Sequence, residues 1–161
     1  MAIAVRLWRI GADTPDYEAH DLSGKGAQTT GGRWNRKGRR VVDTSTTIAL
    51  AWLEKAAHLN TGGLPMNRYL VCIDVPPDVW KMRRTLAGVA VPVGRDAVPQ
   101  GKASLDLGDA WLDALVEPLL LVPSVVVPIE INVLINPAHS LATKLSATKI
   151  CKWRYDQRLE A

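Results

Sequence analysis

Apolar residues recur along the chain in short runs that predict both strands and helices. Residues 3–10 alternate between apolar and other side chains, which is typical of a strand with one face on a core. Residues 68–75 form a β-branched run that ends at two prolines, so we expect a second strand there. Residues 48–59 follow four hydroxyl side chains and predict an N-capped helix. The arc of this helix expected to face the core consists of Ile48, Ala49, Leu50, Trp52, Leu53, Ala56 and Ala57.

The remaining pattern contains shorter elements and one long polar stretch. Residues 11–32 are rich in Gly, Asp, Ser and Thr and predict a long ordered loop, which is often a functional feature in a compact domain. Residues 81–104 have no clear periodicity, and a helix is expected from position 106 or 108 to about 116. Further strands are predicted at 39–43, 119–122, 125–129, 132–135 and 149–155. The order of these elements predicts one mixed α+β domain over residues 1–161.

Composition narrows the class of protein without pointing to an activity. The chain has 161 residues, with 20 Lys and Arg against 16 Asp and Glu, which is an ordinary globular balance. The longest apolar stretch, 115–135, contains carboxylates and prolines, which argues against a membrane helix. The apolar start of the chain is too short for a signal peptide. Cys72 and Cys151 have apolar neighbours and are expected to be reduced core thiols, so we expect a cytoplasmic protein without a membrane anchor.

Charge is unevenly distributed along the chain. Residues 25–40 hold six basic and no acidic side chains, and residues 105–130 hold five acidic and no basic ones. The basic stretch is either a solvated face or an anion site, because arginine matches phosphate oxygens. A non-catalytic module that binds nucleic acid or a basic protein is an alternative. The net charge of +4 is modest, however, and no nucleic-acid-binding motif is present.

The chain contains few groups of residues that are typical of a metal site or a catalytic site. His20, His58 and His139 are far apart and no Cys pair supports them, so we expect no metal site. Ser124 lacks the flanking glycines of a nucleophile elbow, and its pairing with a histidine stays a minor alternative. Glu54 is either a surface carboxylate paired with His58 at i+4, or a half-buried carboxylate facing a cleft.

Three short motifs of this chain together resemble the RES-domain family, the toxin half of RES–Xre toxin–antitoxin modules. The family is named for an Arg, a Glu and a Ser, and these match Arg33 in Gly-Gly-Arg-Trp-Asn, Glu54 in Ala-Leu-Ala-Trp-Leu-Glu and Ser124 in Val-Pro-Ser. The flanking segments 7–10, 132–139 and 155–159 match in the same order. The resemblance therefore covers nearly the whole chain.

The resemblance implies a fold similar to NAD-dependent ADP-ribosyltransferases of the diphtheria-toxin kind, with NAD as the substrate. Cleavage of the nicotinamide–ribose bond passes through an oxocarbenium-like transition state, which Glu54 would stabilise. Arg33 would hold the pyrophosphate, and Ser124 would bind nicotinamide or ribose, or orient Glu54. Trp34 would cover the ligand or pack in the core. Gly31 and Gly32 would allow close approach, with Arg9 and Arg39 as helpers.

Position 43 departs from the family pattern. The resemblance implies a Tyr at the end of the strand before the helix, where its ring would stack on nicotinamide, but this chain has Asp43. Asp43 would face solvent, bind the ligand differently, or weaken the toxin, and of these we prefer weakened activity. A carboxylate near Glu54 would also raise the pKa of one of the two groups.

The resemblance also implies a partner and leaves the acceptor open. The partner would be an Xre-type antitoxin that blocks the NAD cleft and makes any DNA contact itself, so the toxin would not bind nucleic acid directly. A homodimer or a hetero-oligomer with the antitoxin is plausible. ADP-ribose would pass to a protein, to phosphate or to water, and the sequence does not choose between these acceptors.

Overall fold

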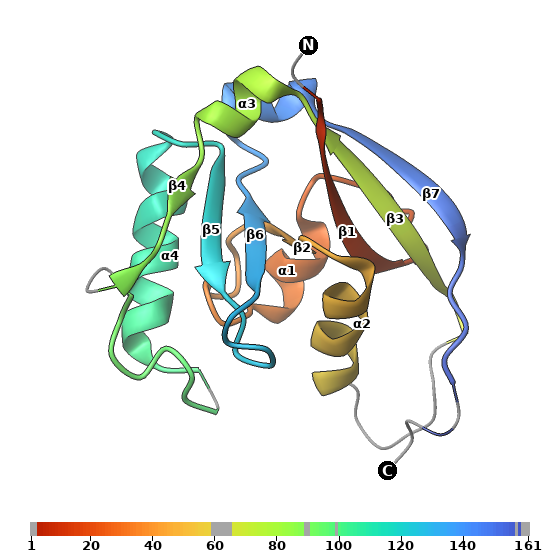
Figure 1. Cartoon of the computed structure of the whole chain (residues 1–161), viewed down its shortest axis with the longest axis horizontal. Helices are drawn as coiled ribbons and strands as arrows, with labels where there is room; N and C mark the ends of the chain where they lie inside the picture. The colour runs from red at the N-terminus through yellow and green to blue at the C-terminus, as the bar shows by residue number, and fades with distance from the viewer. Residues whose placement is uncertain (1–2, 59–65, 89–90, 99, 157, 159–161) are drawn as a thin grey trace.

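One seven-stranded sheet organises the computed structural model, which describes residues 3–58, 66–88, 91–98, 100–156 and 158 (Figure 1). Its strand order is β4-β5-β6-β2-β1-β3-β7, and all neighbours are antiparallel except the pair β4–β5. The strands are β1 Val5–Ala12, β2 Val42–Ser45, β3 Arg68–Val75, β4 Arg84–Thr85, β5 Leu119–Pro123, β6 Ile131–Ile135 and β7 Ser146–Lys152. The helices are α1 Lys25–Thr30, α2 Ile48–Ala57, α3 Pro77–Lys81 and α4 Lys102–Ala114, with a 3-10 helix η2 at Ser140–Lys144. The expected mixed α+β domain is confirmed.

The sheet is nearly divided between β2 and β1. These strands are paired in register only at Trp8 and Ser45, whereas β1 and β3 pair along their full length. Strands β1, β3 and β7 run obliquely to β5 and β6, and α2 lies below the lower end of β1 in this view (Figure 1). Arg9 of β1 and Asp43 of β2 lie beyond this paired position, where the two halves of the sheet separate.

Apolar residues fill both faces of the central strands. Alternate residues of β5 enter different cores: Leu119 and Leu121 join one cluster, whereas Leu120 and Val122 join the other. The first cluster extends along β1 and β3, and the second lies beneath α4. Burial on both faces explains why β5 is a continuous apolar run and not an alternating one.

Several predicted strand boundaries need correction. Residues 125–129 are not a strand but part of the connection between β5 and β6. Pro128 inside the segment cannot donate a ladder hydrogen bond, and the Ser124 hydroxyl accepts the backbone N–H groups of Val126 and Val127. Strand β2 begins at Val42 instead of position 39, and it continues through Thr44 and Ser45, which pair with β6. Among the hydroxyl residues expected to cap α2, Thr47 is the cap. The last strand is Ser146–Lys152, not 149–155.

Helices also differ from the expectation. The polar stretch 11–32 contains α1, which follows Gly24 in a left-handed conformation (φ +77°) without a side-chain cap. Helix α4 begins at Lys102 after the uncapped Gly101, so the usual cap signal is absent. In α2 the buried residues are Leu50 and Ala51, whereas Ile48 and Leu53 of the predicted arc are exposed. Its predicted end, Leu59, lies outside the described residues.

The cysteine expectation is half correct. Both thiols are free, and Cys72 is buried in β3, where burial raises the pKa of its thiol. Cys151 is exposed near the end of β7, because this edge strand has solvent on most of its side chains. Within the described part of the chain, no helix is long and apolar enough to cross a membrane.

Candidate functional site

Glu54 is held by two side chains that come from the opposite half of the sheet. Its Oε1 atom accepts a hydrogen bond from the Ser124 hydroxyl (2.5 Å) and another from the Asn132 amide (2.6 Å). Glu54 projects from α2, whereas Ser124 follows β5 and Asn132 lies on β6. Both bonds use Oε1, and the structure shows no hydrogen bond from the described residues to Oε2. The structure therefore supports the reading of Glu54 as a partly buried, oriented carboxylate.

Ser124 is fully buried and acts on Glu54, not on the surface. Its hydroxyl oxygen accepts the backbone N–H groups of Val126 and Val127 at 3.1 and 3.0 Å, while its O–H donates to Glu54. These bonds fix the direction of the hydroxyl proton. Of the roles expected for Ser124, the geometry corresponds to orientation of Glu54.

Asn132 and Ser45 belong to the same network but were not predicted as site residues. The Ser45 hydroxyl donates to the Asn132 Oδ1 atom (2.7 Å), which turns the Asn132 NH₂ group toward Glu54. The register pairs Ser45 directly with Asn132 across β2 and β6. The signal available in the sequence was a polar residue inside each of two apolar strands. Cross-strand pairing alone determines that they act together.

Asp43 lies at the parting of the two sheet halves and is crowded by protein although its side chain reaches solvent. This crowding raises the pKa of the Asp43 carboxyl, and the repulsion from Glu54 adds a small further increase. The charges of Arg9, Lys55 and His58 act in the opposite direction. Asp43 is thus near Glu54, as expected, but desolvation and not Glu54 is the main cause of its raised pKa.

The Gly-Gly-Arg-Trp-Asn segment forms a tight turn after α1. Gly31 has a φ of +67°, and a Cβ on Gly32 would lie 2.9 Å from the Asn35 Oδ1 atom, so the turn itself requires small residues. Asn35 is buried and its amide donates to the carbonyls of Ala27 and Arg39. The Arg33 Nη1 atom donates to the carbonyls of residues 95 and 97 at 2.8 and 2.7 Å. Arg33 is therefore positioned by backbone groups, and its role toward pyrophosphate stays a prediction.

Trp34 packs in the core and not over an open surface. Only 6% of it is exposed, and it belongs to the cluster that contains Trp111 of α4. A Cβ on Gly108 would lie 1.7 Å from the Trp34 carbonyl oxygen, so α4 approaches this segment as closely as backbone allows. Of the two roles expected for Trp34, the structure shows the core role.

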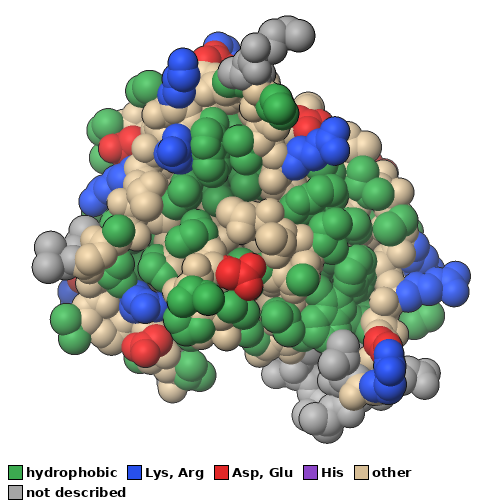
Figure 2. All heavy atoms as spheres, in the orientation of Figure 1, with side chains coloured by type: hydrophobic (Ala, Val, Ile, Leu, Met, Phe, Trp, Pro, Cys, Tyr) green, Lys and Arg blue, Asp and Glu red, His purple; other side chains and the backbone are tan. Residues whose placement is uncertain are grey.

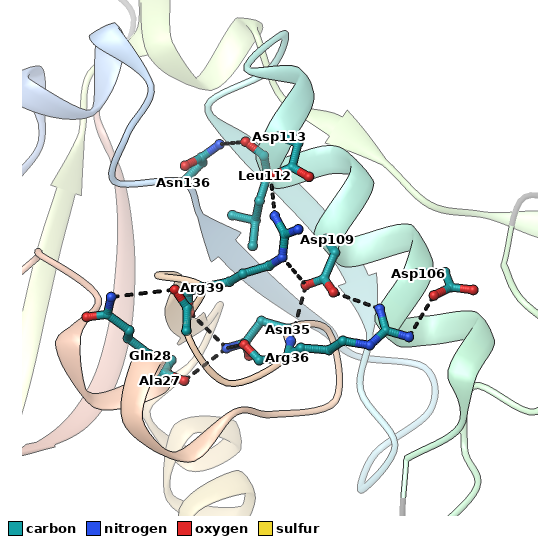
Figure 3. Close-up of polar contacts among 11 residues, drawn as sticks. Ala27, Gln28, Asn35, Arg36, Arg39, Asp106, Asp109, Leu112, Asp113 and Asn136 are labelled. Atoms are coloured by element: carbon teal, nitrogen blue, oxygen red, sulfur yellow. Dashed lines mark hydrogen bonds and ion pairs between the residues drawn. The ribbon is translucent and has the colours of Figure 1, made fainter.

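Two arginines of the basic stretch pair with three carboxylates of the acidic stretch, so this part of the basic stretch is neither a solvated face nor an open anion site (Figure 3). Asp109 is buried on α4 and accepts from both the backbone N–H and the Nη1 atom of Arg36 (3.1 and 2.8 Å). Arg36 also pairs with Asp106, and Arg39 pairs with Asp109 and Asp113. Arg39, expected as a helper in ligand binding, is thus engaged with α4. These pairs attach the segment after Trp34 to α4.

An open apolar hollow lies on the outer side of α2. It is lined by Ala49, Trp52 and Leu53 of α2 and by residues 153, 154 and 156 near the C-terminus. Figure 2 shows apolar side chains gathered over this part of the surface, with charged groups mostly toward the periphery. The rings of Trp52 and Tyr155 meet with centroids 6.1 Å apart. Gln157 and Leu159 of the terminal motif lie outside the described residues.

Comparison with known proteins identifies the family. The sequence profile of the RES domain matches residues 6–157. The chain belongs to the RES domain family. It is 51% identical over 153 residues to the "Prs ADP-ribosylating toxin" of Sphingobium sp. strain YBL2, with 95% of each chain covered. It is also 35% identical to a "Toxin Res" of Pseudomonas putida (84% of this chain, 87% of the relative) and 31% identical to one of Yersinia enterocolitica (89% and 93%).

The Arg, Glu and Ser that give the family its name have different hydrogen-bond partners in this structure. Glu54 and Ser124 are in direct contact, whereas Arg33 is held in a separate turn by the 95–97 segment. Within the residues that the structure describes, no group of three or more His, Cys, Asp and Glu side chains could hold a metal ion.

Proposed function

We propose that this RES domain is a toxin that cleaves the nicotinamide–ribose bond of NAD and transfers ADP-ribose to a protein. The hydrogen-bonded Glu54 carboxylate carries the proposal, together with membership of a family whose relatives bear toxin names. A carboxylate held by two donors on one oxygen keeps the other oxygen available for a developing positive charge. Electrostatic stabilisation by groups held in place before the reaction is usually the largest single contribution to catalysis.

The proposed reaction requires no cofactor beyond the substrate. The bond between the ribose C1′ and the nicotinamide nitrogen breaks, and nicotinamide leaves with the bonding electron pair. Glu54 stabilises the resulting oxocarbenium-like ribose, as carboxylates do in glycoside cleavage. The acceptor oxygen or nitrogen then forms a bond to C1′ and releases its proton. Ser124 and Asn132 keep Glu54 in place throughout, without touching the reacting atoms.

A protein acceptor is favoured over water or phosphate by the name of one relative. The Sphingobium protein is named for ADP-ribosylation of Prs, and its identity to this chain covers nearly the full length of both. We therefore propose Prs as the first acceptor to test. If mass spectrometry finds only free or phosphorylated ADP-ribose when purified Prs is present, transfer to this protein is wrong while NAD cleavage stands.

Nicotinamide release from NAD tests the catalytic assignment. Glu54→Gln should reduce kcat by about 100-fold or more, because the charge is lost while the size is kept. Asn132→Ala should have a smaller effect in the same direction. Glu18→Gln is a matched control, since Glu18 is exposed and its ion-pair partner is His20. Full turnover by Glu54→Gln would remove Glu54 from the mechanism.

We also propose an Xre-type antitoxin as the partner, which covers the region around Glu54. Co-purification of the two proteins, followed by an NAD cleavage assay, tests this proposal. The complex should release little nicotinamide, and an active complex would contradict blockage of the NAD cleft. The alternative of a basic nucleic-acid-binding patch is disfavoured, because Arg36 and Arg39 are paired with α4.

A further inference from the structure

The apolar hollow beside α2 lies on the side of this helix that faces away from the sheet. Leu50 and Ala51 are the buried residues of α2, which packs on β1 and β2. Glu54 points the same way, because its carboxylate accepts from Asn132 of β6. A helix turns by about 100° per residue, so the Trp52 side chain, which lines the hollow, is rotated by about 160° from that of Glu54. A molecule bound in the hollow would therefore contact α2 without covering the Glu54 carboxylate.

The walls of the hollow are mainly apolar and come from two segments that are distant in sequence. Trp153, from the segment after β7, lines it together with three residues of α2, namely Ala49, Trp52 and Leu53. Leu53 is 38% exposed, and Ile48 on the same outward side of α2 is 37% exposed. Exposed apolar residues that gather around a concavity are typical of a binding surface, and tryptophan is enriched in such surfaces. The hollow is therefore suited to an apolar side chain of another molecule.

Two buried donors beside the hollow have no hydrogen-bond acceptor among the described residues. They are the Nε atom of Arg68 and the indole nitrogen of Trp153. The Trp153 backbone N–H donates to the Arg68 carbonyl oxygen (2.8 Å), so these two residues are neighbours at the end of the β3–β7 pairing. Arg68 lies on the sheet face that α2 covers, because it is four residues before Cys72, which cross-strand pairs connect to Asn132. Buried donors without acceptors are uncommon in folded proteins and are often explained by a ligand.

The charges around the hollow indicate which group supplies the missing acceptor. Asp156 lines the hollow but is paired with Arg158. Within the described residues, neither Arg68 nor Arg154 forms an ion pair. A carboxylate complements two such cations and accepts charge-assisted hydrogen bonds from guanidinium groups, as well as the indole N–H. The hollow therefore fits a peptide segment in which a carboxylate lies next to an apolar side chain.

We propose that the hollow is the docking site for the protein that accepts ADP-ribose, and that it binds an apolar side chain and a neighbouring carboxylate of that protein. The inference rests on the proposed function and names the surface that selects its acceptor. An inhibitor of NAD cleavage has to cover Glu54, whereas an acceptor must leave Glu54 open to NAD, and the hollow meets the second requirement. A helix is about 10–12 Å across and an extended chain rises about 3.3 Å per residue, so about five residues reach from the hollow around α2 to the side of Glu54. The modified side chain then lies about five residues from the docking carboxylate.

ADP-ribosylation of purified Prs, followed by mass spectrometry, tests the docking site. Leu53→Asp and Arg154→Glu each change an exposed side chain of the hollow. Both should raise KM for Prs by about tenfold or more, while kcat at saturating Prs and nicotinamide release without Prs stay within about twofold. Met82→Asp and Lys81→Glu, exposed at the C-terminal end of α3 and far from α2 (Figure 1), are the matched controls and should leave KM unchanged. An unchanged KM in both hollow variants would overturn the docking site.

A binding measurement separates this inference from the proposed function. Calorimetry should detect Prs binding to the wild-type chain in the absence of NAD, and Leu53→Asp or Arg154→Glu should weaken that binding by about tenfold or more. If Prs binds in this way while no nicotinamide is released from NAD, the docking site stands and the proposed function fails. If NAD is cleaved while Prs shows no binding that depends on these two residues, the docking site is wrong and the proposed cleavage stands. Weaker binding of an Xre-type antitoxin, or loss of a homodimer, in the same variants with Prs binding unchanged would assign the hollow to that partner and overturn the inference.

Discussion

Replacing Lys55 by Met should stabilise the ligand-free protein at neutral pH. Burial, followed by repulsion from Arg68 and Arg9, lowers the pKa of Lys55 from 10.5 to about 8. At about 1.4 kcal/mol per pKa unit, charged Lys55 costs the folded state up to about 3 kcal/mol. Met keeps most of the aliphatic stem and carries no charge. We therefore expect the free energy of unfolding at pH 7 to rise by about 1–3 kcal/mol in Lys55→Met.

The lowered pKa of Lys55 also predicts how the stability difference between wild type and variant changes with pH. Between about pH 8 and 10.5 the unfolded chain keeps the Lys55 proton while the folded chain loses it, so wild-type stability should rise with pH relative to the variant. Urea unfolding at pH 7, 8, 9 and 10 measures the difference, which should shrink across this window. Lys81→Met on the exposed end of α3 is the control, and its effect should stay within about 0.5 kcal/mol. A Lys55→Met protein that is no more stable than wild type at pH 7, with a difference that does not vary with pH, would refute the reasoning.

Three further substitutions test other parts of the structure. Gly108→Ala places a Cβ 1.7 Å from the Trp34 carbonyl oxygen, so chemical denaturation should show a loss of at least about 2 kcal/mol. Asp109→Asn removes a buried carboxylate from two arginines and should cost about 3 kcal/mol. Asp113→Asn, at an exposed position on the same helix, should cost less than about 1 kcal/mol, and equal losses would disprove the special position of Asp109. Asp43→Tyr should raise NAD turnover if the acid weakens this toxin, and unchanged or lower turnover would count against that interpretation.

The sequence was most informative where a residue's environment depends on close neighbours in the chain. Residues 68–75 were predicted as a strand with its observed bounds, because β-branched residues and a Pro-Pro stop act locally. Thr47 caps α2 through its hydroxyl, as expected for that cluster of hydroxyl residues. The prediction of a strand at residues 125–129 was wrong for the opposite reason. They have the composition of a strand, but Pro128 and the Ser124 hydroxyl hold them in a turn.

The sequence indicated two residues of the candidate site but not their contact. Glu54 and Ser124 were both expected, yet their hydrogen bond joins positions 70 residues apart. Asn132 was missed as a site residue, since nothing in a lone Asn on a strand says which side chain it will meet. Arg39 was expected near the ligand, but α4 supplies two carboxylates to it. Position along the chain does not reveal which opposite charge will be closest.

The sequence by itself determined the mixed α+β class, the buried central strands and the set of residues that mark a RES domain. These depend on apolar periodicity, turn residues and short motifs, each of which spans a few residues. Only the tertiary structure decided that β1 and β2 part after one paired position, that Glu54 is fixed by the other half of the sheet, and that burial raises the pKa of Asp43. The physical reason is that hydrogen bonds, charges and desolvation act over a few ångströms in space, and folding alone brings distant segments within that range.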